Sequence, residues 1–144
     1  SMAVLTAARN TPMKDHTAFK RAYPVGNDIV YQGGLVSMLV SSGTGVLLAS
    51  SDTDNHRVIG VALDTVDGTG GDSPTCEVYT QGSFQFAADT PLTSWIGQVA
   101  CVADDATVQL AATATHNIIV GLIEAIDGTN GLVWVRLQPD HVTA

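Results

Sequence analysis

The sequence predicts an all-β protein: a single compact β-barrel or sandwich of short strands, built from two similar halves and preceded by an N-terminal arm. Three observations support this prediction. A related stretch occurs twice, at residues 55–69 and 116–129. Short apolar runs rich in β-branched residues alternate with turn residues along the chain. Only 14% of the 144 residues are charged and 14 are glycine, which suits many turns and little charged helical surface.

The repeat has the same organisation in both copies. A histidine and an asparagine precede an apolar run that is interrupted by one glycine, Gly60 or Gly121, and an Asp-Gly turn closes the run. A repeat of this kind indicates one supersecondary unit used twice. Two copies are too few for a solenoid, so we expect two halves of one structure. We interpret each glycine as a bulge or a place where a neighbouring backbone approaches closely, rather than as a ligand site.

The expected strands follow one another at close spacing. Asp-Gly favours a tight hairpin turn because glycine accepts positive φ. The glycine-rich loop 67–74 is longer than its counterpart in the second copy, and polar turns separate the other runs. The expected strands are 29–31, 35–40, 46–49, 58–63, 76–81, 83–86, 99–101, 108–110, 118–123 and 132–137.

The N-terminal region differs from the rest of the chain in charge. We assign residues 1–25 to the arm and 26–144 to the β-domain. Prolines at 12 and 24 confine any helix to the segment between them, and an extended arm is an equal alternative. Residues 1–27 have a net charge of +3 and residues 28–144 of −11. The basic residues of the arm are the candidate binding residues, the alternative being a solvated tail: Arg9, Lys14, Lys20 and Arg21.

No residue pattern indicates catalysis, so we expect no enzyme and no catalytic, cofactor-binding or metal-binding residues. Cys76 and Cys101 lie in separate expected strands, where buried apolar cysteines are favoured over a disulfide. The serine-containing turns lack the G-x-S-x-G pattern, and no phosphate-binding loop is present. The four histidines are His16, His56, His116 and His141, and no two of them have the spacing of metal ligands. Turn capping is the favoured role of the two in the repeat, His56 and His116, and a site shared across the barrel is the alternative.

Composition also excludes some partners. A net charge of −8 argues against direct nucleic-acid binding. The longest apolar runs are too short for a membrane span, and the N-terminal apolar stretch is too short for a signal peptide. We interpret Ser1, which precedes Met2, as a cloning remnant.

From Gly26 to Leu137 the sequence resembles the head decoration, or capsid cement, proteins of tailed bacteriophages. The similarity covers about three quarters of the chain and depends on the order of several weak motifs. These are Gly-x-Asp-Ile-Val at 26–30, Val-Ile-Gly-Val-Ala at 58–62, the hairpin 78–86 around Gly82, Ile-Gly-x-Val at 96–99, Val-Gly-Leu at 120–122 and Val-x-Val-Arg-Leu at 133–137.

The resemblance implies a structural virion protein on the outer surface of the phage head, made in the host cytoplasm. It implies binding to the assembled major capsid protein lattice and self-association, often as a homotrimer, and it carries no catalytic residues or cofactor. The basic residues of the arm would then anchor the protein to the capsid or to a neighbouring copy. Deletion of residues 2–22 should leave the β-domain folded. The alternative is a carbohydrate- or host-surface-binding β module of a phage fibre or tail.

Overall fold

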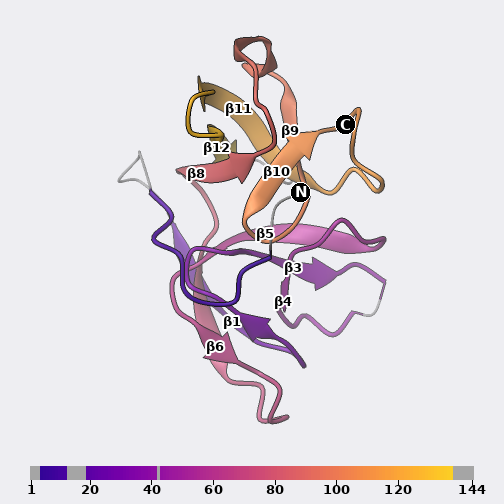
Figure 1. Ribbon diagram of the computed structural model, residues 1–144. Helices are drawn as coiled ribbons and strands as arrows, with labels where there is room; N and C mark the ends of the chain where they lie inside the picture. The colour runs from indigo at the N-terminus through magenta and orange to yellow at the C-terminus, as the bar shows by residue number, and fades with distance from the viewer. Residues whose placement is uncertain (1–3, 13–18, 42, 138–144) are drawn as a thin grey trace.

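The computed structural model describes residues 4–12, 19–41 and 43–137. Within these residues the protein is all-β, as predicted, with strands and one short 3-10 turn, η1 (Thr93–Trp95). The strands form two similar units that follow one another along the chain and lie one above the other in Figure 1.

The first unit, which we call barrel 1, is a five-stranded sheet with the order β1-β7-β5-β3-β4. The residue that follows its edge strand β1, Val25, and the residue that precedes its other edge strand β4, Leu47, form one isolated parallel bridge. The amide of Leu47 donates to the carbonyl of Pro24 at 2.8 Å, and the amide of Gly26 donates to the carbonyl of Leu47 at 2.9 Å. A small two-stranded sheet, β2 (Ile29–Val30) with β6 (Val66–Asp67), extends from it. The five strands are β1 (Lys20–Pro24), β3 (Leu35–Leu39), β4 (Leu48–Ala49), β5 (His56–Ala62) and β7 (Thr75–Tyr79).

The second unit, barrel 2, is a closed barrel with the order β10-β8-β12-β11-β9. It closes by a parallel pairing of β8 with β10, in which Ala88 is in register with Val108. The remaining pairs are antiparallel, as in barrel 1. The strands are β8 (Ser83–Ala88), β9 (Val99–Val102), β10 (Thr107–Leu110), β11 (Ile119–Asp127) and β12 (Leu132–Leu137).

The two barrels therefore have one topology used twice, which confirms the two halves predicted from the repeat. β1, β3, β4, β5 and β7 correspond in order to β8, β9, β10, β11 and β12. In each copy a β-bulge immediately precedes the repeated glycine: Ile59 is the extra residue before Gly60, and Val120 is the extra residue before Gly121. A Cβ at Gly60 would overlap the carbonyl oxygen of Tyr79, so the expected close approach of a neighbouring backbone is also present there.

The core is continuous between the barrels. The larger apolar cluster is centred on Phe84 and Phe86 of β8, and Val58 and Val61 of β5 pack into it from barrel 1. A smaller cluster fills the rest of barrel 1: Val25, Val30, Val36, Leu47, Ala62, Cys76 and Val78. Burial of these side chains is the main stabilising contribution to the fold.

The expected arm, residues 1–25, is too long at its C-terminal end, because its last residues belong to the β-structure. Residues Lys20–Pro24 are the strand β1, in register with β7, and Val25 is completely buried. The charges and the proline of this stretch obscured its alternation, in which Arg21 and Tyr23 lie opposite buried residues of β7. Deletion of residues 2–22 would remove three of the five residues of β1, so we no longer expect that variant to keep the fold intact.

Candidate functional site

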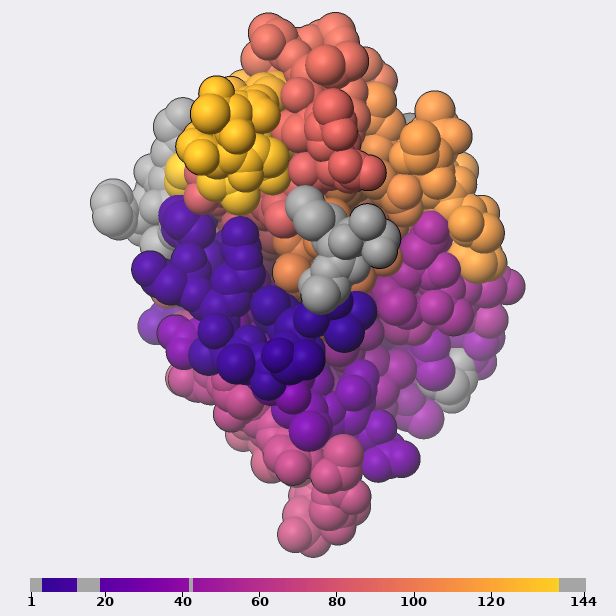
Figure 2. Space-filling view, viewed as in Figure 1, coloured from indigo at the N-terminus to yellow at the C-terminus, as the bar shows by residue number. Residues whose placement is uncertain are grey.

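Residues 4–12, which we call the strap, lie across both barrels. The amide of Arg9 donates to the carbonyl of Gln32 in barrel 1 at 2.6 Å, and the carbonyl of Pro12 accepts from the amide of Gln85 in barrel 2 at 3.1 Å. The amide of Leu5 donates to the carboxylate of Asp105 at 2.9 Å. Figure 2 shows the strap in indigo on the face between the two barrels. The strap thus connects the barrels by contacts distant in sequence.

Arg9 has a role within the fold. Its side chain is half-buried and donates from Nη1 to the hydroxyl of Thr11 at 2.8 Å and to the carbonyl of Gln85 at 2.9 Å. Burial lowers the pKa of its guanidinium, because desolvation disfavours the charged form. Arg9, one of the predicted binding residues, therefore already donates a hydrogen bond to barrel 2.

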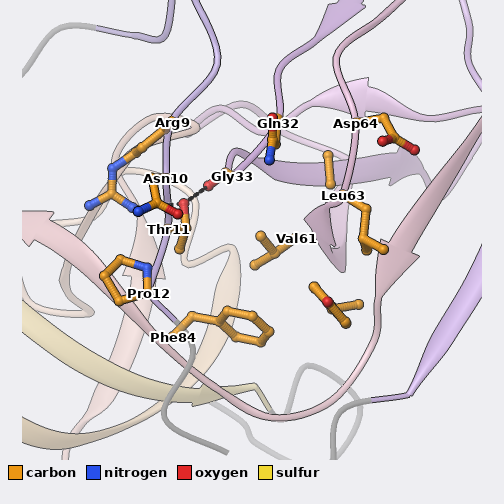
Figure 3. A pocket seen from close by; sticks show the side chains of 12 residues that line it. Arg9, Asn10, Thr11, Pro12, Gln32, Gly33, Val61, Leu63, Asp64 and Phe84 are labelled. Carbon is orange, nitrogen blue, oxygen red and sulfur yellow. Dashed lines mark hydrogen bonds between the residues drawn. The ribbon is translucent and has the colours of Figure 1, made fainter. Parts of the chain in front are cut away.

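The strap crosses barrel 1 at Gly33. This residue has a φ of +83° and is buried, and a Cβ there would overlap the carbonyl oxygen of Arg9. The hydroxyl of Thr11 donates to the carbonyl of Gly33 (Figure 3). The absence of a side chain at Gly33 therefore allows the strap to pass.

A cleft of about 400 Å³ lies beside the strap, and Figure 3 shows its lining. Apolar side chains line one side, among them Val61, Leu63 and Phe84, and strap residues Arg9 to Pro12 line the other. Since the Arg9 guanidinium already has acceptors, we see in this cleft a junction between the barrels rather than a site for chemistry.

A second cleft, of about 610 Å³, lies near the start of the strap. It contains His56, whose Nδ1 is buried with no hydrogen-bond partner. Burial lowers the pKa of His56, and the opposing attraction of Asp28 is smaller. The Asp28 carboxylate accepts from the amides of Ile29 at 2.8 Å and Ala49 at 3.0 Å. His56 thus occupies an environment that favours the neutral imidazole, and its predicted capping role is not seen at Nδ1.

Asp52 joins the loops of the two barrels. Its carboxylate accepts from the amides of Thr115 at 2.8 Å and His116 at 2.9 Å and from the side-chain amide of Gln109 at 3.1 Å. Burial alone would raise the pKa of Asp52, but these hydrogen bonds and the nearby His116 hold it below its usual value. The Nδ1 atom of His116 lies 2.9 Å from the carbonyl oxygen of Asp52. The two repeat histidines therefore have different surroundings and different roles.

Two of the remaining predicted binding residues, Lys20 and Arg21, lie on β1. Lys14 lies outside the described residues, while Lys20 and Arg21 are exposed on β1. Phe19, which precedes them, is 61% exposed. The structure therefore brings together two of the four predicted basic residues on one strand, beside an exposed aromatic ring.

The cysteines are buried apolar residues, as predicted, since Cys76 and Cys101 are both free and buried. Burial raises the pKa of the Cys101 thiol to about 11.

In residues 4–12, 19–41 and 43–137 no three His, Cys, Asp or Glu side chains are grouped closely enough to hold a metal ion. No helix in the same part of the chain has the length and apolar character needed to cross a membrane.

Comparison with known proteins finds several solved chains of similar arrangement. One of them is the N base of the head fibre gp8.5 of bacteriophage phi29, with 14% sequence identity and a TM-score of 0.48 over 88% of this chain and 100% of that chain. At this identity and TM-score the similarity supports no inference about function. No protein-family model matches the chain, and no curated protein sequence matches it.

Proposed function

We propose that the chain is a structural protein of a tailed-bacteriophage virion that binds the outside of the assembled head and stabilises it. The observation that carries this proposal is the ordered series of stretches resembling the decoration proteins. These stretches fall on or beside β2, β5, the β7–β8 hairpin, β9, β11 and β12, so the similarity extends over both barrels. The proposed role is one of binding, not of catalysis.

Stabilisation would follow from preferential binding. A protein that binds the assembled lattice more tightly than the separated capsid subunits shifts the equilibrium toward the assembled shell. Several linked copies that touch several capsid subunits gain further through multivalency. We therefore include a homotrimer of this chain in the proposal.

The direct test is co-sedimentation of the purified protein with expanded heads that lack a decoration protein. We expect saturable binding to the heads and much weaker binding to dissociated capsid subunits. Decorated heads should also withstand higher temperature before releasing DNA. Equal binding to shells and to free subunits, or none to either, would contradict the proposal.

Oligomeric state is a separate measurement. Light scattering of the protein in solution should report three copies, and saturated heads should carry copies in multiples of three. A monomer in solution that also saturates the heads at single, independent positions would exclude the trimer while leaving the head-binding role intact.

A sugar-binding role would need aromatic rings open for stacking on sugars. Phe84 and Phe86 are buried, and the ring of Tyr79 packs beside that of Phe84 with centroids 5.6 Å apart. These three rings therefore serve the core, whereas the ring of Phe19 is exposed. Glycan-array binding without head binding would favour the carbohydrate-binding alternative.

A further inference from the structure

The outer edge of β1 carries backbone groups that have no hydrogen-bond partner among the described residues. Antiparallel strands direct the amide groups of alternate residues toward the same neighbour. The carbonyl of Phe19 accepts from the amide of Thr80 at 2.8 Å, so residues 19, 21 and 23 face β7 and the amides of Lys20 and Ala22 point away from it. Within the described residues, no hydrogen bond reaches these outward amides. They form an edge onto which another strand can add.

The equivalent edge of barrel 2 is occupied. Because Val25 and Ala88 hold the same place in the two parallel closures, Ala22 of β1 corresponds to Gln85 of β8. The outward amide of Gln85 donates to the carbonyl of Pro12, and its carbonyl accepts from the Arg9 side chain. An extended segment, the strap, thus covers the edge of β8. The duplicated topology predicts the same kind of occupant for the edge of β1.

The side chains at the β1 edge define the chemistry of that occupant. Lys20 and Arg21 are exposed, and neither pairs with a carboxylate among the residues that the structure describes, although the chain has a net charge of −8. Phe19 adds an exposed ring beside them. Lysine on an edge strand discourages pairing with a neutral or basic strand, whereas carboxylates opposite these cations would favour it.

We infer that the β1 edge, residues 19–23, binds an extended acidic segment of another protein by strand addition. Backbone hydrogen bonds to Lys20 and Ala22 would supply affinity, and pairing of carboxylates with Lys20 and Arg21 would supply selectivity. The strap of a second copy fits less well, because its Arg9 would approach these cations. The same recognition applies whether the acidic segment belongs to a phage shell protein or to another partner.

The test uses the full chain and three labelled peptides of equal length. The peptides share the same threonine and valine residues and differ only at a common set of variable positions. These positions carry glutamate in one peptide, glutamine in the second and lysine in the third. Fluorescence anisotropy should show binding of the glutamate peptide that weakens as salt rises, because salt screens exposed charges. Binding of the glutamine and lysine peptides should be much weaker. Equal binding of all three, or binding of none, would overturn the inference.

Two variants locate the binding at β1. Lys20→Glu combined with Arg21→Glu should weaken binding of the glutamate peptide about tenfold or more, since several surface pairs are reversed together. The control is Arg57→Glu, which reverses one exposed cation on β5 and should have little effect, and it is compared with Lys20→Glu alone, which changes the net charge equally. Equal weakening by these two single changes would indicate non-specific attraction and overturn the inference.

Ala22→Pro tests the backbone contribution, because it removes an outward N–H at an edge position that tolerates proline. Its fold is checked by circular dichroism, and the charge variants remain informative if it does not fold. Folded Ala22→Pro that binds the glutamate peptide as tightly as the native chain would exclude strand addition. Self-association that this variant abolishes would assign the edge to a second copy instead. Head co-sedimentation of the native chain is unaffected by any of these outcomes.

Discussion

The two barrels share one strand order but differ in how completely their edges are covered. In barrel 2, β8 pairs with β10 at two registered positions, and the strap lies on the rest of the β8 edge. In barrel 1, the only link at this place within the described residues is a single bridge beside the ends of β1 and β4, between Val25 and Leu47. The larger apolar cluster is mainly in barrel 2. The comparison teaches that one duplicated topology can provide a closed, well-packed half and a half in which one strand edge has no partner among the described residues.

The largest expected effect comes from removing a large core side chain from barrel 2, which holds most of the larger apolar cluster. Phe86 is completely buried, and its equivalent in barrel 1, Tyr23, is only half-buried. Phe86→Ala should lower the free energy of unfolding by about 3–5 kcal/mol through lost burial and a residual cavity. Tyr23→Ala should lower it by less than about 2 kcal/mol. Urea denaturation followed by circular dichroism measures both, and equal losses would contradict the difference between the barrels.

The second effect tests the glycine of the repeat. Gly60→Val places a side chain against the carbonyl of Tyr79, so we expect a loss of about 1–3 kcal/mol in the free energy of unfolding. Gly121→Val should act in the same direction, since Gly121 follows the equivalent bulge. Gly70→Val is the matched control, because a Cβ at Gly70 meets no atom within 4 Å. Thermal melting compares the variants. A native melting temperature for Gly60→Val would remove the close-approach explanation.

The sequence predicted the features that depend on local pattern. The alternation of apolar and polar residues predicted most strands, and the repeated glycine predicted the duplicated bulge. The repeat also predicted two halves. Alignment of the flanking apolar runs by sequence alone matches Val46 with Val108 and Cys76 with Leu132. In the structure the correspondence differs by one residue, because Leu47 corresponds to Val108 and Cys76 to Val133. The coarse alignment of apolar runs could not resolve that shift, because adjacent residues in these runs are chemically alike.

Features that depend on distant contacts were not predictable in this way. β1 carries two adjacent cations, and its pairing with β7 joins residues far apart in the sequence. The role of Arg9 depends on the Gln85 carbonyl, and the role of Asp52 depends on the backbone of residues 115–116. No local pattern indicates either contact. Counting charges therefore grouped Arg9 with Lys20 and Arg21, whereas burial separates them.

The third effect tests the connection between the barrels at Asp52. Because its folded pKa lies below its usual value, its contribution to stability is present above the unfolded pKa, about 4, and is lost as pH falls through the folded pKa. Asp52→Asn should therefore lower stability near neutral pH by about 1–2 kcal/mol. The difference from the native chain should shrink below about pH 4. Urea denaturation across a pH series measures it.

Asp67→Asn is the control for this experiment. Its carboxylate also has a lowered pKa, caused by hydrogen bonds from Thr69, but these lie within one exposed turn of barrel 1. It should change stability less than Asp52→Asn. A larger effect at Asp67 would show that the connection between the barrels contributes little at Asp52.

The smallest effect concerns Asp105, where the strap, barrel 2 and barrel 1 meet. Asp105 lies between β9 and β10, its carboxylate accepts from the amide of Leu5, and its backbone carbonyl accepts from the amide of Leu35 at 2.8 Å. Burial raises the pKa of the Asp105 carboxyl, and the nearby charges of Asp104 and Asp28 raise it further, against the hydrogen bond from Leu5. Ionisation of Asp105 therefore opposes folding while its hydrogen bond supports it.

The sign of the pH dependence separates these two contributions. A raised folded pKa means that the cost of the charge is absent at low pH and develops as pH rises from the unfolded pKa through the folded pKa. Asp105→Asn keeps an acceptor for Leu5 without the charge, so its melting temperature should rise by roughly 2–4 °C at pH 7, or about 1 kcal/mol. The gain should vanish near pH 3. Asp105→Leu loses the acceptor as well and should be destabilised at both pH values, because the Leu5 amide would have no partner. A lower melting temperature of Asp105→Asn at pH 7 would show that the charged carboxylate itself holds the strap to barrel 2.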